Sequence, residues 1–321
     1  MDPRDFGFMT STIRQKRITQ LRQDDVIFID ESSVFVGPDV EIGRGTRIYP
    51  NVMLLGKTKI CENCEIEMGV TLDNMKIGDN STIRSNCYLA DSTIGSGCNI
   101  WSGVRMYNSR LGDNVTVHSP NRIVGSKIGN CAEIDSYCLI KYAIVGPSCK
   151  VGPSAILEGE KLANNELAAG KQTVKLAGHC TVGVQAHLHD WVVVNPEAEI
   201  AHCEIVRSFI GKRTKVKHCS YIGDATIYRD CNIGAHTVFG NYDGKKKHRI
   251  IVMPEVFIGI HTSIISAKTR RIGAGAFIGA DTLIKEEVEP GKVVVRKVSR
   301  LEVVGHSRRT KDGWEITKPE A

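Results

Sequence analysis

Aliphatic residues recur along most of this chain with a short, fixed period. From residue 36 onward they stand six residues apart, at Val36, Ile42, Ile48, Leu54, Ile60, Ile66 and Leu72. The steps then become six, six and five, so that an aliphatic residue followed by glycine returns every 17 residues, at Ile77, Ile94, Leu111, Ile128 and Val145. We interpret each unit as a short strand and a tight turn, with three units closing one triangular coil. The repeat predicts an all-β solenoid whose aliphatic corners point inward and stack from coil to coil.

The two ends of the chain depart from this repeat. Residues 1–30 are expected to form a short helix or linker, because Thr10, Ser11 and Thr12 can cap a helix; a frayed arm is the alternative. The solenoid is expected over residues 31–289. A basic tail is expected over residues 290–321.

The repeat is also interrupted inside the solenoid. Between about residues 158 and 182 the periodicity lapses, and residues 160–171 are a candidate helix or lid, although an inert surface insertion is favoured. Later, the tetrad Asn241-Tyr242-Asp243-Gly244 breaks the rhythm. Asn, Asp and Gly supply turn chemistry, so this tetrad is expected to project outward as a loop.

Composition narrows the class of protein. Aromatic residues make up 6% of the chain and the net charge is +6, which fits a repetitive β architecture and is compatible with phosphate-bearing ligands. No window approaches the roughly 20 apolar residues of a membrane span, and the first 25 residues are too polar for a signal peptide. We expect a cytoplasmic protein that binds neither membrane nor nucleic acid.

Eleven cysteines raise the question of disulfides or zinc. Six of them stand four residues after an aliphatic corner, where other coils carry Ser or Ala, at Cys64, Cys87, Cys98, Cys138, Cys149 and Cys231. The Cys61/Cys64 pair has no partner pair at zinc-finger spacing. We therefore interpret these cysteines as small buried residues and predict no metal site.

A packed prism has no internal cavity, so ligands must bind on its outer faces. Pockets are concave, and neighbouring chains are expected to supply the missing walls. A cyclic homotrimer of parallel prisms would meet this need.

Four groups of residues resemble the acetyltransferase domain of the bifunctional bacterial enzyme that makes UDP-N-acetylglucosamine. They are His218-x-x-Tyr221-x-Gly223-Asp224-Ala225, Asn232-Ile233-Gly234-Ala235, Asn241-Tyr242-Asp243-Gly244 and Lys247. Weaker similarity extends to residues 26–30 and 311–314. The resemblance implies a left-handed parallel β-helix of the hexapeptide-repeat transferases. It also implies acetyl transfer from acetyl-CoA to an amino sugar such as glucosamine-1-phosphate. The family's uridyltransferase half is not expected here, so a separate sugar nucleotidyltransferase is a candidate partner.

The resemblance also implies roles for individual residues. His218 would be the general base that takes the ammonium proton, which suits an imidazole near neutral pH, and Asn232 would act beside it. The implied acceptor contacts are Tyr221, Asn241, Lys247 and Arg207. The implied cofactor contacts are Ala235, Tyr242, Gly259 and Ala280. Because the coil is 17 residues long here, residue 218 should stack under residue 235.

Some positions depart from the family pattern. Where the family has a Lys that holds the sugar phosphate, this sequence has Val206, with Arg207 beside it. Where the family has an Arg for the same phosphate, this sequence has Glu158 or His189, depending on where the insertion is placed. Where the family has a Ser that contacts the cofactor, this sequence has Ile260. The residues for acetyl transfer thus match the family pattern, whereas the residues that would hold the sugar phosphate, here called the phosphate clamp, differ from it.

Two other functions compete with the transferase. A non-catalytic relative could bind a sugar nucleotide or a partner, and Val206 and Ile260 favour that alternative. A metalloenzyme of the carbonic anhydrase type would need three histidines to converge between subunits, drawn from His187, His189, His202, His218 and His236. Residues 218 and 236 lie 18 apart where the coil is 17, so these two histidines are not expected to stack in register.

Overall fold

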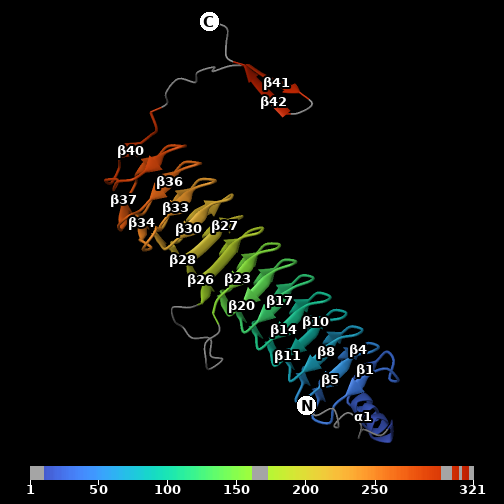
Figure 1. Cartoon of the computed structure of the whole chain (residues 1–321). Coiled ribbons are helices and arrows are strands. Elements are labelled where there is room, and N and C mark those ends of the chain that lie inside the picture. Colours follow the sequence, from blue (N-terminus) through green and yellow to red (C-terminus); the bar gives the residue numbers. More distant parts are fainter. Residues whose placement is uncertain (1–10, 161–172, 298–305, 311–312, 318–321) are drawn as a thin grey trace.

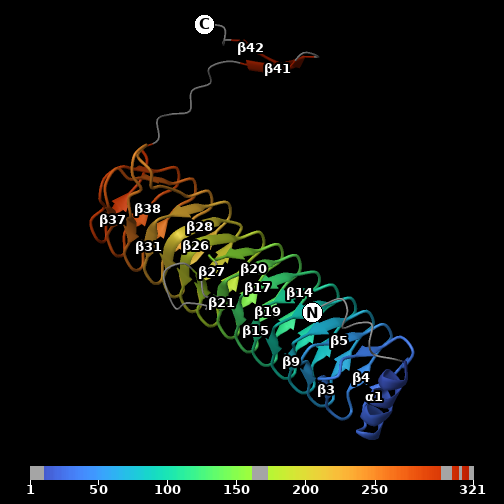
Figure 2. The ribbon, with the colours of Figure 1, turned by 60° about the horizontal axis from the view of Figure 1, so that its bottom comes forward.

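The computed structural model describes residues 11–160, 173–297, 306–310 and 313–317. Figures 1 and 2 show a long triangular prism of stacked coils with one helix at its N-terminal end. The prism is a left-handed parallel β-helix, as the repeat and the resemblance predict. Apart from a terminal hairpin, β41 (His306–Thr310) with β42 (Gly313–Thr317), every strand pairing is parallel.

One face of the prism, here called face A, is a sheet of 15 strands. These are β1 (Ile27–Phe28), β4 (Arg47–Ile48), β7 (Glu65–Ile66), β10 (Thr82–Ile83), β13 (Asn99–Ile100), β16 (Thr116–Val117), β19 (Glu133–Ile134), β22 (Lys150–Val151), β25 (Thr181–Val182), β27 (Glu199–Ala201), β29 (Lys215–Lys217), β32 (Asn232–Ile233), β35 (Phe257–Ile258), β38 (Phe277–Ile278) and β40 (Val293–Val294).

The next face along each coil, face B, carries the strands that follow face A. These are β2 (Phe35–Val36), β5 (Met53–Leu55), β8 (Thr71–Asp73), β11 (Tyr88–Ala90), β14 (Arg105–Tyr107), β17 (Arg122–Val124), β20 (Leu139–Lys141), β23 (Ile156–Glu158), β30 (Tyr221–Gly223), β33 (Val238–Gly240), β36 (Ser263–Ile265) and β39 (Leu283–Ile284).

Face C closes the triangle. Its strands are β3 (Glu41–Ile42), β6 (Lys59–Ile60), β9 (Lys76–Ile77), β12 (Thr93–Ile94), β15 (Arg110–Leu111), β18 (Lys127–Ile128), β21 (Ala143–Val145), β24 (Val174–Leu176), β31 (Ala225–Ile227), β34 (Ile250–Val252) and β37 (Arg270–Ile272). Two longer strands, β26 (His187–Val194) and β28 (Glu204–Ile210), turn the corner and belong to both faces B and C, so these two faces form a single 25-stranded sheet.

The register confirms the 17-residue repeat. On face C, Ile94 pairs with Ile77 and with Leu111, and on face A, Ile100 pairs with Ile83 and with Val117. The corner aliphatics are buried, as Ile94 at 1% and Ile128 at 3% exposure illustrate. Successive corners therefore stack at the roughly 4.8 Å spacing of paired strands and form one continuous core.

The N-terminal helix, α1 (Ser11–Gln23), covers the open end of this core. Its Ile18 and Leu21 are buried. Asp25 adopts a left-handed conformation (φ 61°), and the Val26 amide donates to the Leu21 carbonyl at 3.0 Å. This αL cap ends the helix and turns the chain into the first coil.

The structure shifts two predicted boundaries. Strand β24 pairs in register with β21 from Val174 onward, so the coil resumes before residue 182 and the irregular stretch is shorter than predicted. The candidate lid at 160–171 lies almost wholly outside the described residues. At the other end, β40 still pairs with β38, so the solenoid continues beyond residue 289.

The buried cysteines do more than fill space. The thiols of Cys87, Cys98 and Cys138 each lie 3.1 Å from a carbonyl oxygen of the next coil, and the Ser81 hydroxyl makes the same contact at 2.9 Å. Burial raises the pKa of Cys87 to about 12. These thiols stay protonated and donate weakly between coils, which explains why Ser can replace Cys at this position.

Candidate functional site

The predicted catalytic residues lie around one edge of the prism, between faces A and B. His218 is in the turn from β29 to β30, where its backbone is left-handed (φ 58°) and its side chain is exposed. Asn232 lies on β32 of face A and Tyr221 on β30 of face B. His218 thus lies at the edge between face A, which carries Asn232, and face B, which carries Tyr221.

The register confirms that residue 218 stacks under residue 235. Lys215 pairs with Asn232 and Tyr221 pairs with Val238, both at an offset of 17. In the intervening turn, the His236 amide donates to the His218 carbonyl at 2.8 Å. The proposed base is therefore one coil below the residue assigned to the cofactor.

Three of the four predicted cofactor residues share this edge, and the fourth does not. Coils pack so closely there that a Cβ atom at Gly234 would lie 2.7 Å from the Gly259 carbonyl carbon, and one at Gly259 would lie 2.6 Å from the Ala280 nitrogen. Ala235 precedes β33, whereas Tyr242 follows it in the outward loop and is 59% exposed. Tyr242 is thus at the opposite end of face B from Ala235, Gly259 and Ala280.

Tyr221 and Asn241 meet above Gly223 on face B. A Cβ atom at Gly223 would lie 2.7 Å from the Tyr221 hydroxyl oxygen and 2.9 Å from the Asn241 Nδ2. Only glycine leaves room for both groups. Burial, assisted by the charge of Glu204, raises the pKa of Tyr221, so its hydroxyl remains a hydrogen-bond donor at neutral pH.

The loop after β33 is a compact outward turn, as predicted. Tyr242 and Lys247 form an antiparallel bridge, and the Tyr242 hydroxyl donates to the Gly244 carbonyl at 2.7 Å. The Asp243 carboxylate accepts the amides of Lys245 and Lys246, each at 2.7 Å, and lies 2.6 Å from His248 Nε2. The two backbone amides and His248 hold the pKa of Asp243 well below its usual range. Within the loop, Lys247 is exposed.

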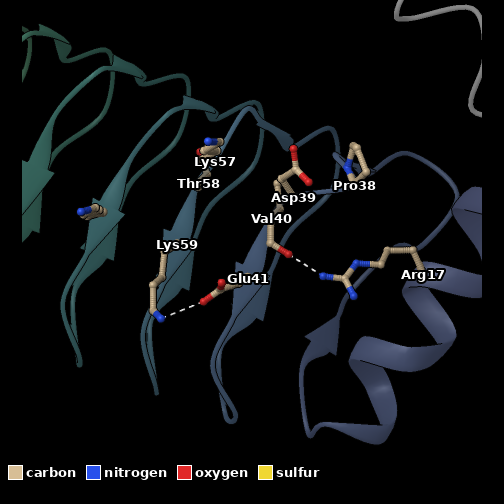
Figure 3. A pocket seen from close by; sticks show the side chains of 9 residues that line it. Arg17, Pro38, Asp39, Val40, Glu41, Lys57, Thr58 and Lys59 are labelled. Atoms are coloured by element: carbon tan, nitrogen blue, oxygen red, sulfur yellow. Dashed lines mark hydrogen bonds and ion pairs between the residues drawn. The ribbon is translucent and has the colours of Figure 1, made fainter.

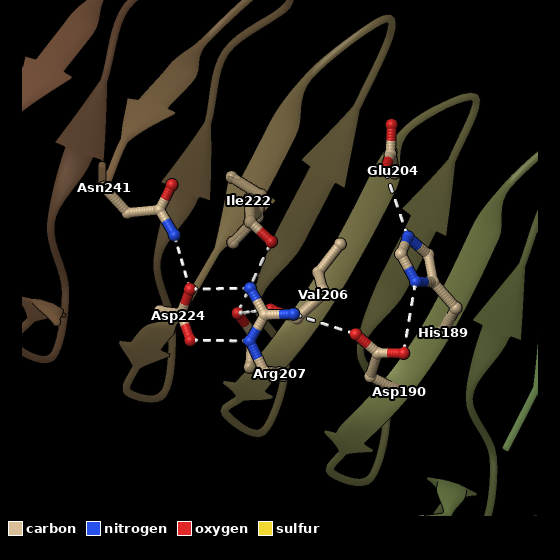
Figure 4. A network of polar contacts seen from close by, with 9 residues as sticks. His189, Asp190, Glu204, Val206, Arg207, Ile222, Asp224 and Asn241 are labelled. Carbon is tan, nitrogen blue, oxygen red and sulfur yellow. Dashed lines mark hydrogen bonds and ion pairs between the residues drawn. The ribbon is translucent and has the colours of Figure 1, made fainter. Parts of the chain in front are cut away.

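Arg207 belongs to a polar network at the edge between faces B and C (Figure 4). Its Nε and Nη2 donate to the two carboxylate oxygens of Asp224, both at 2.8 Å, and its Nη1 donates to Asp190 at 2.8 Å. Asp224 also accepts the side-chain amide of Asn241. The hydrogen bonds to Asp224 raise the pKa of Arg207 above its usual value. These ion pairs argue against a direct substrate contact by Arg207.

The positions of the expected phosphate clamp form one column on face B. Glu158 pairs with His189 and His189 pairs with Val206, so the two sequence alternatives for the Arg position are stacked neighbours. Lys141 reaches Glu158 at 2.8 Å, and His189 Nε2 lies 3.0 Å from Glu204. The cation Lys141 is thus already neutralised by a carboxylate within the column.

Two residues of this surface, Asp190 and Glu204, escaped the sequence interpretation. Asp224 was quoted in a motif but given no role, and His187 was considered only as a metal ligand. His187 contacts His189 with ring centroids 4.5 Å apart, and burial, followed by the charge of His189, lowers the pKa of His187. Asp190, Arg207, Asp224 and Asn241 are each 17 residues apart. Extending the coil length from one of them through the sequence would have found the others.

A separate open hollow of about 460 Å³ lies between α1 and the first coils, far along the prism from these residues (Figure 3). Arg17 donates there to the Val40 carbonyl at 2.5 Å, and Lys59 pairs with Glu41 at 2.7 Å. The first contact attaches α1 to the solenoid, and the second links two adjacent coils. Within the described ranges, no three His, Cys, Asp or Glu side chains gather as metal ligands. The helix that the structure describes is too short and too polar to cross a membrane.

Known proteins are similar to this chain along almost its whole length. Residues 30–129 match the family model of the GMPPB C-terminal domain. The bifunctional protein GlmU of Clostridium beijerinckii is 30% identical over 295 residues, which cover 91% of this chain and 46% of that protein. GlmU of Thermotoga maritima is 26% identical over 97% of this chain and 49% of its own length.

The chain also resembles solved structures of hexapeptide-type acyltransferases in outline. A UDP-N-acetylglucosamine acyltransferase from Campylobacter jejuni matches 62% of this chain and 66% of its own, at 14% identity and a TM-score of 0.32. The chain spans about half the length of the two GlmU proteins above. The sequence matches and the coil register together identify it as a hexapeptide-repeat β-helix protein that is homologous to the bifunctional GlmU proteins over nearly all of its own length.

Proposed function

We propose that this protein transfers the acetyl group of acetyl-CoA to the amine of an amino sugar, glucosamine-1-phosphate or a related compound. The observation that carries the proposal is the edge at His218, where an exposed histidine lies one coil below Ala235, with Asn232 on one adjoining face and Tyr221 on the other. The GlmU homology supports the same reaction class. Acetyl-CoA is a substrate in this reaction.

The chemistry assigns each group a step. The amine attacks the thioester carbonyl carbon, the C–N bond forms, and His218 takes the proton released by the ammonium nitrogen. The side-chain amide of Asn232 or backbone N–H groups of the edge stabilise the tetrahedral oxyanion. The C–S bond then breaks, and CoA leaves as a thiol after protonation. Ala280 is exposed at this edge and Gly259 is buried beneath the neighbouring coil, so the pantetheine arm would lie along the outside of the edge.

Tyr221, Asn241 and Lys247 are the proposed acceptor contacts, and Tyr242 with Ala235, Gly259 and Ala280 the proposed cofactor contacts. Because the last three are at the opposite end of β33 from Tyr242, one prism alone does not bring Tyr242 together with the other three cofactor contacts. A homotrimer would place the loop of one chain against the edge of another. Light scattering at micromolar concentration should give three times the chain mass, and a monomer would contradict this arrangement.

The column of Glu158, His189 and Val206 favours a second candidate, a non-catalytic relative that binds a sugar nucleotide. The deciding experiment measures CoA release by wild-type protein against a panel of amino sugars with and without phosphate, with calorimetry of acetyl-CoA binding alongside. Turnover supports the transferase. Acetyl-CoA binding without turnover supports the non-catalytic relative. A protein that shows neither turnover nor binding would overturn both candidate functions.

A further inference from the structure

Asp224 is attached to both ends of the loop that follows β33. Its carboxylate accepts the side-chain amide of Asn241, the first residue of the loop, which is 4% exposed. Its backbone carbonyl accepts the amide of Ile250, the first residue after the loop, at 3.3 Å. One aspartate therefore contacts both the residue where the loop leaves the prism and the residue where it returns, in addition to the strand pairing of β33 and β34.

Arg207 in turn fixes the Asp224 carboxylate. The guanidinium binds both carboxylate oxygens at 2.8 Å and is itself held by Asp190. A bidentate pair of this kind restricts the rotation of both partners. Asp190, Arg207 and Asp224 occupy the same left-handed turn of three successive coils, with φ of 60°, 45° and 48°, and Figure 4 shows their side chains lying together.

The loop has few other attachments. Its internal contacts, the bridge between Tyr242 and Lys247 and the Asp243 hydrogen bonds, make it a self-contained unit. At its C-terminal end, Arg249 Nη1 donates to Thr226 Oγ1 at 2.9 Å and the Arg249 carbonyl accepts the Arg270 amide at 3.0 Å. At its N-terminal end, the side chain of Asn241 is held by Asp224. A self-contained unit tethered at its two ends moves as a body when one end loosens.

We propose that Arg207 and Asp224 are positioning residues, which hold the loop bearing Tyr242 and Lys247 against the coils without contacting substrate. The consequence for catalysis rests on the proposed function, whereas the attachment of the loop does not. The proposal replaces the substrate contact that the sequence assigned to Arg207.

The chain contains a matched control. Arg213 and Asp230 form a second bidentate pair, with Nε–Oδ1 at 2.6 Å and Nη2–Oδ2 at 2.7 Å, again between left-handed residues of successive coils. No loop leaves the prism at that edge, since β31 and β32 are joined by a regular turn. Removing either arginine deletes the same kind of ion pair, but only Arg207 is connected to the loop.

The first test is limited trypsin digestion, because residues 245–249 (Lys-Lys-Lys-His-Arg) offer cleavage sites inside the loop. In Arg207→Gln, cleavage there, quantified by mass spectrometry, should be about tenfold faster than in wild type, since proteolysis follows the population of the open loop. Arg207→Lys, which keeps the charge but not the bidentate geometry, should fall between. Equal cleavage in Arg207→Gln and Arg213→Gln, with both variants folded by circular dichroism, would overturn the proposal.

The second test separates positioning from substrate binding. The loop carries two proposed acceptor contacts, Asn241 and Lys247, and one proposed cofactor contact, Tyr242, so Arg207→Gln should raise KM for acceptor and for acetyl-CoA together. A direct substrate contact would raise the acceptor KM alone, and that result would also overturn the proposal. If wild type shows no turnover, the proposed function fails while the digestion still decides whether Arg207 holds the loop.

Discussion

The two halves of the solenoid fill the same structural positions with different residues. Left-handed turns recur at the edges of the prism throughout. In the coils before residue 160 they are occupied mainly by glycine and asparagine, including Asn51, Asn63, Asn74, Asn80, Asn86, Asn108 and Asn114. After residue 173 they are occupied mainly by titratable residues, including His179, Asp190, Glu197, His202, Arg207, Arg213, His218, Asp224, Asp230, His236, Glu255, His261 and Asp281.

The difference has a physical meaning. Glycine and asparagine tolerate a positive φ at low cost, whereas other residues give up roughly 1–2 kcal/mol. Ion pairs offset part of that cost at Arg207 and Arg213. Strained positions of this kind cluster at functional sites. At these turns, the first half therefore has residues that tolerate a positive φ, whereas the second half has residues whose side chains make polar contacts.

A charge in the core of the regular half should have the largest effect. Ile94→Asp or Ile128→Asp should abolish folding, because these side chains are 1% and 3% exposed and an unpaired buried carboxylate costs several kcal/mol. That is comparable to a whole domain's stability of about 5–15 kcal/mol. The control is Thr93→Asp, which points outward on the same strand between Lys76 and Arg110. A cooperatively melting Ile94→Asp protein would show that the corner assignment is wrong.

The irregular half should instead respond in activity. His218→Ala should lower acetyl transfer by about 100-fold or more, the usual loss for a general base, while calorimetry shows little change in acetyl-CoA affinity. Because alanine is strained at φ 58°, His218→Asn provides a second variant that tolerates the turn. Unchanged turnover in both variants would remove His218 from the mechanism.

A smaller effect is expected from the loop. Lys247→Ala should raise the acceptor KM by about five- to tenfold, as for the loss of one exposed charge contact of about 1 kcal/mol. Lys245→Ala, two residues away in the same exposed loop, should leave KM unchanged. Equal effects would mean that the loop acts only through its total charge.

The backbone preference of the regular half can be tested directly. Asn114→Ala should lower the free energy of unfolding by about 1 kcal/mol, because alanine tolerates φ 56° poorly, whereas Asn114→Gly should be nearly neutral. Chemical denaturation measures both. If glycine destabilises as much as alanine, the side chain of Asn114 matters more than its backbone.

The smallest effect concerns pH. Burial alone would raise the pKa of Asp224, but Arg207 and Asn241 outweigh it and lower that pKa. A lowered folded pKa stabilises the fold above the unfolded value of about 3.9, and the contribution is lost as pH falls through the folded value. The difference in Tm between wild type and Arg207→Gln should therefore be present at pH 6 and shrink as the pH falls below about 3.9. A difference that persists in acid would mean that Asp224 is not its origin.

The sequence predicted correctly those features that depend on the pairing of each coil with the next one. The stacking of residue 218 under residue 235 follows from a 17-residue period, and the register confirms it. The outward loop at 241–244 follows from turn residues that break this period, and the bridge between Tyr242 and Lys247 confirms it. Boundaries were less accurate. The coil resumes with β24 at Val174 and not at residue 182. The prediction misplaced this boundary because a long insertion interrupts the repeat and its phase cannot be followed through the insertion.

The sequence by itself determined the fold, because aliphatic corners at a constant spacing can be buried only by stacking coil upon coil. It also located the candidate catalytic edge, since the motifs near His218 fall on consecutive coils. Only the tertiary structure decided where individual side chains go. Val206 and Arg207 are neighbours on β28, but Val206 is buried whereas Arg207 occupies the left-handed corner where β28 passes from face B to face C, so their contacts depend on the coils above and below. Arg207 is therefore held between Asp190 and Asp224, a choice made by packing between coils that a linear pattern does not contain.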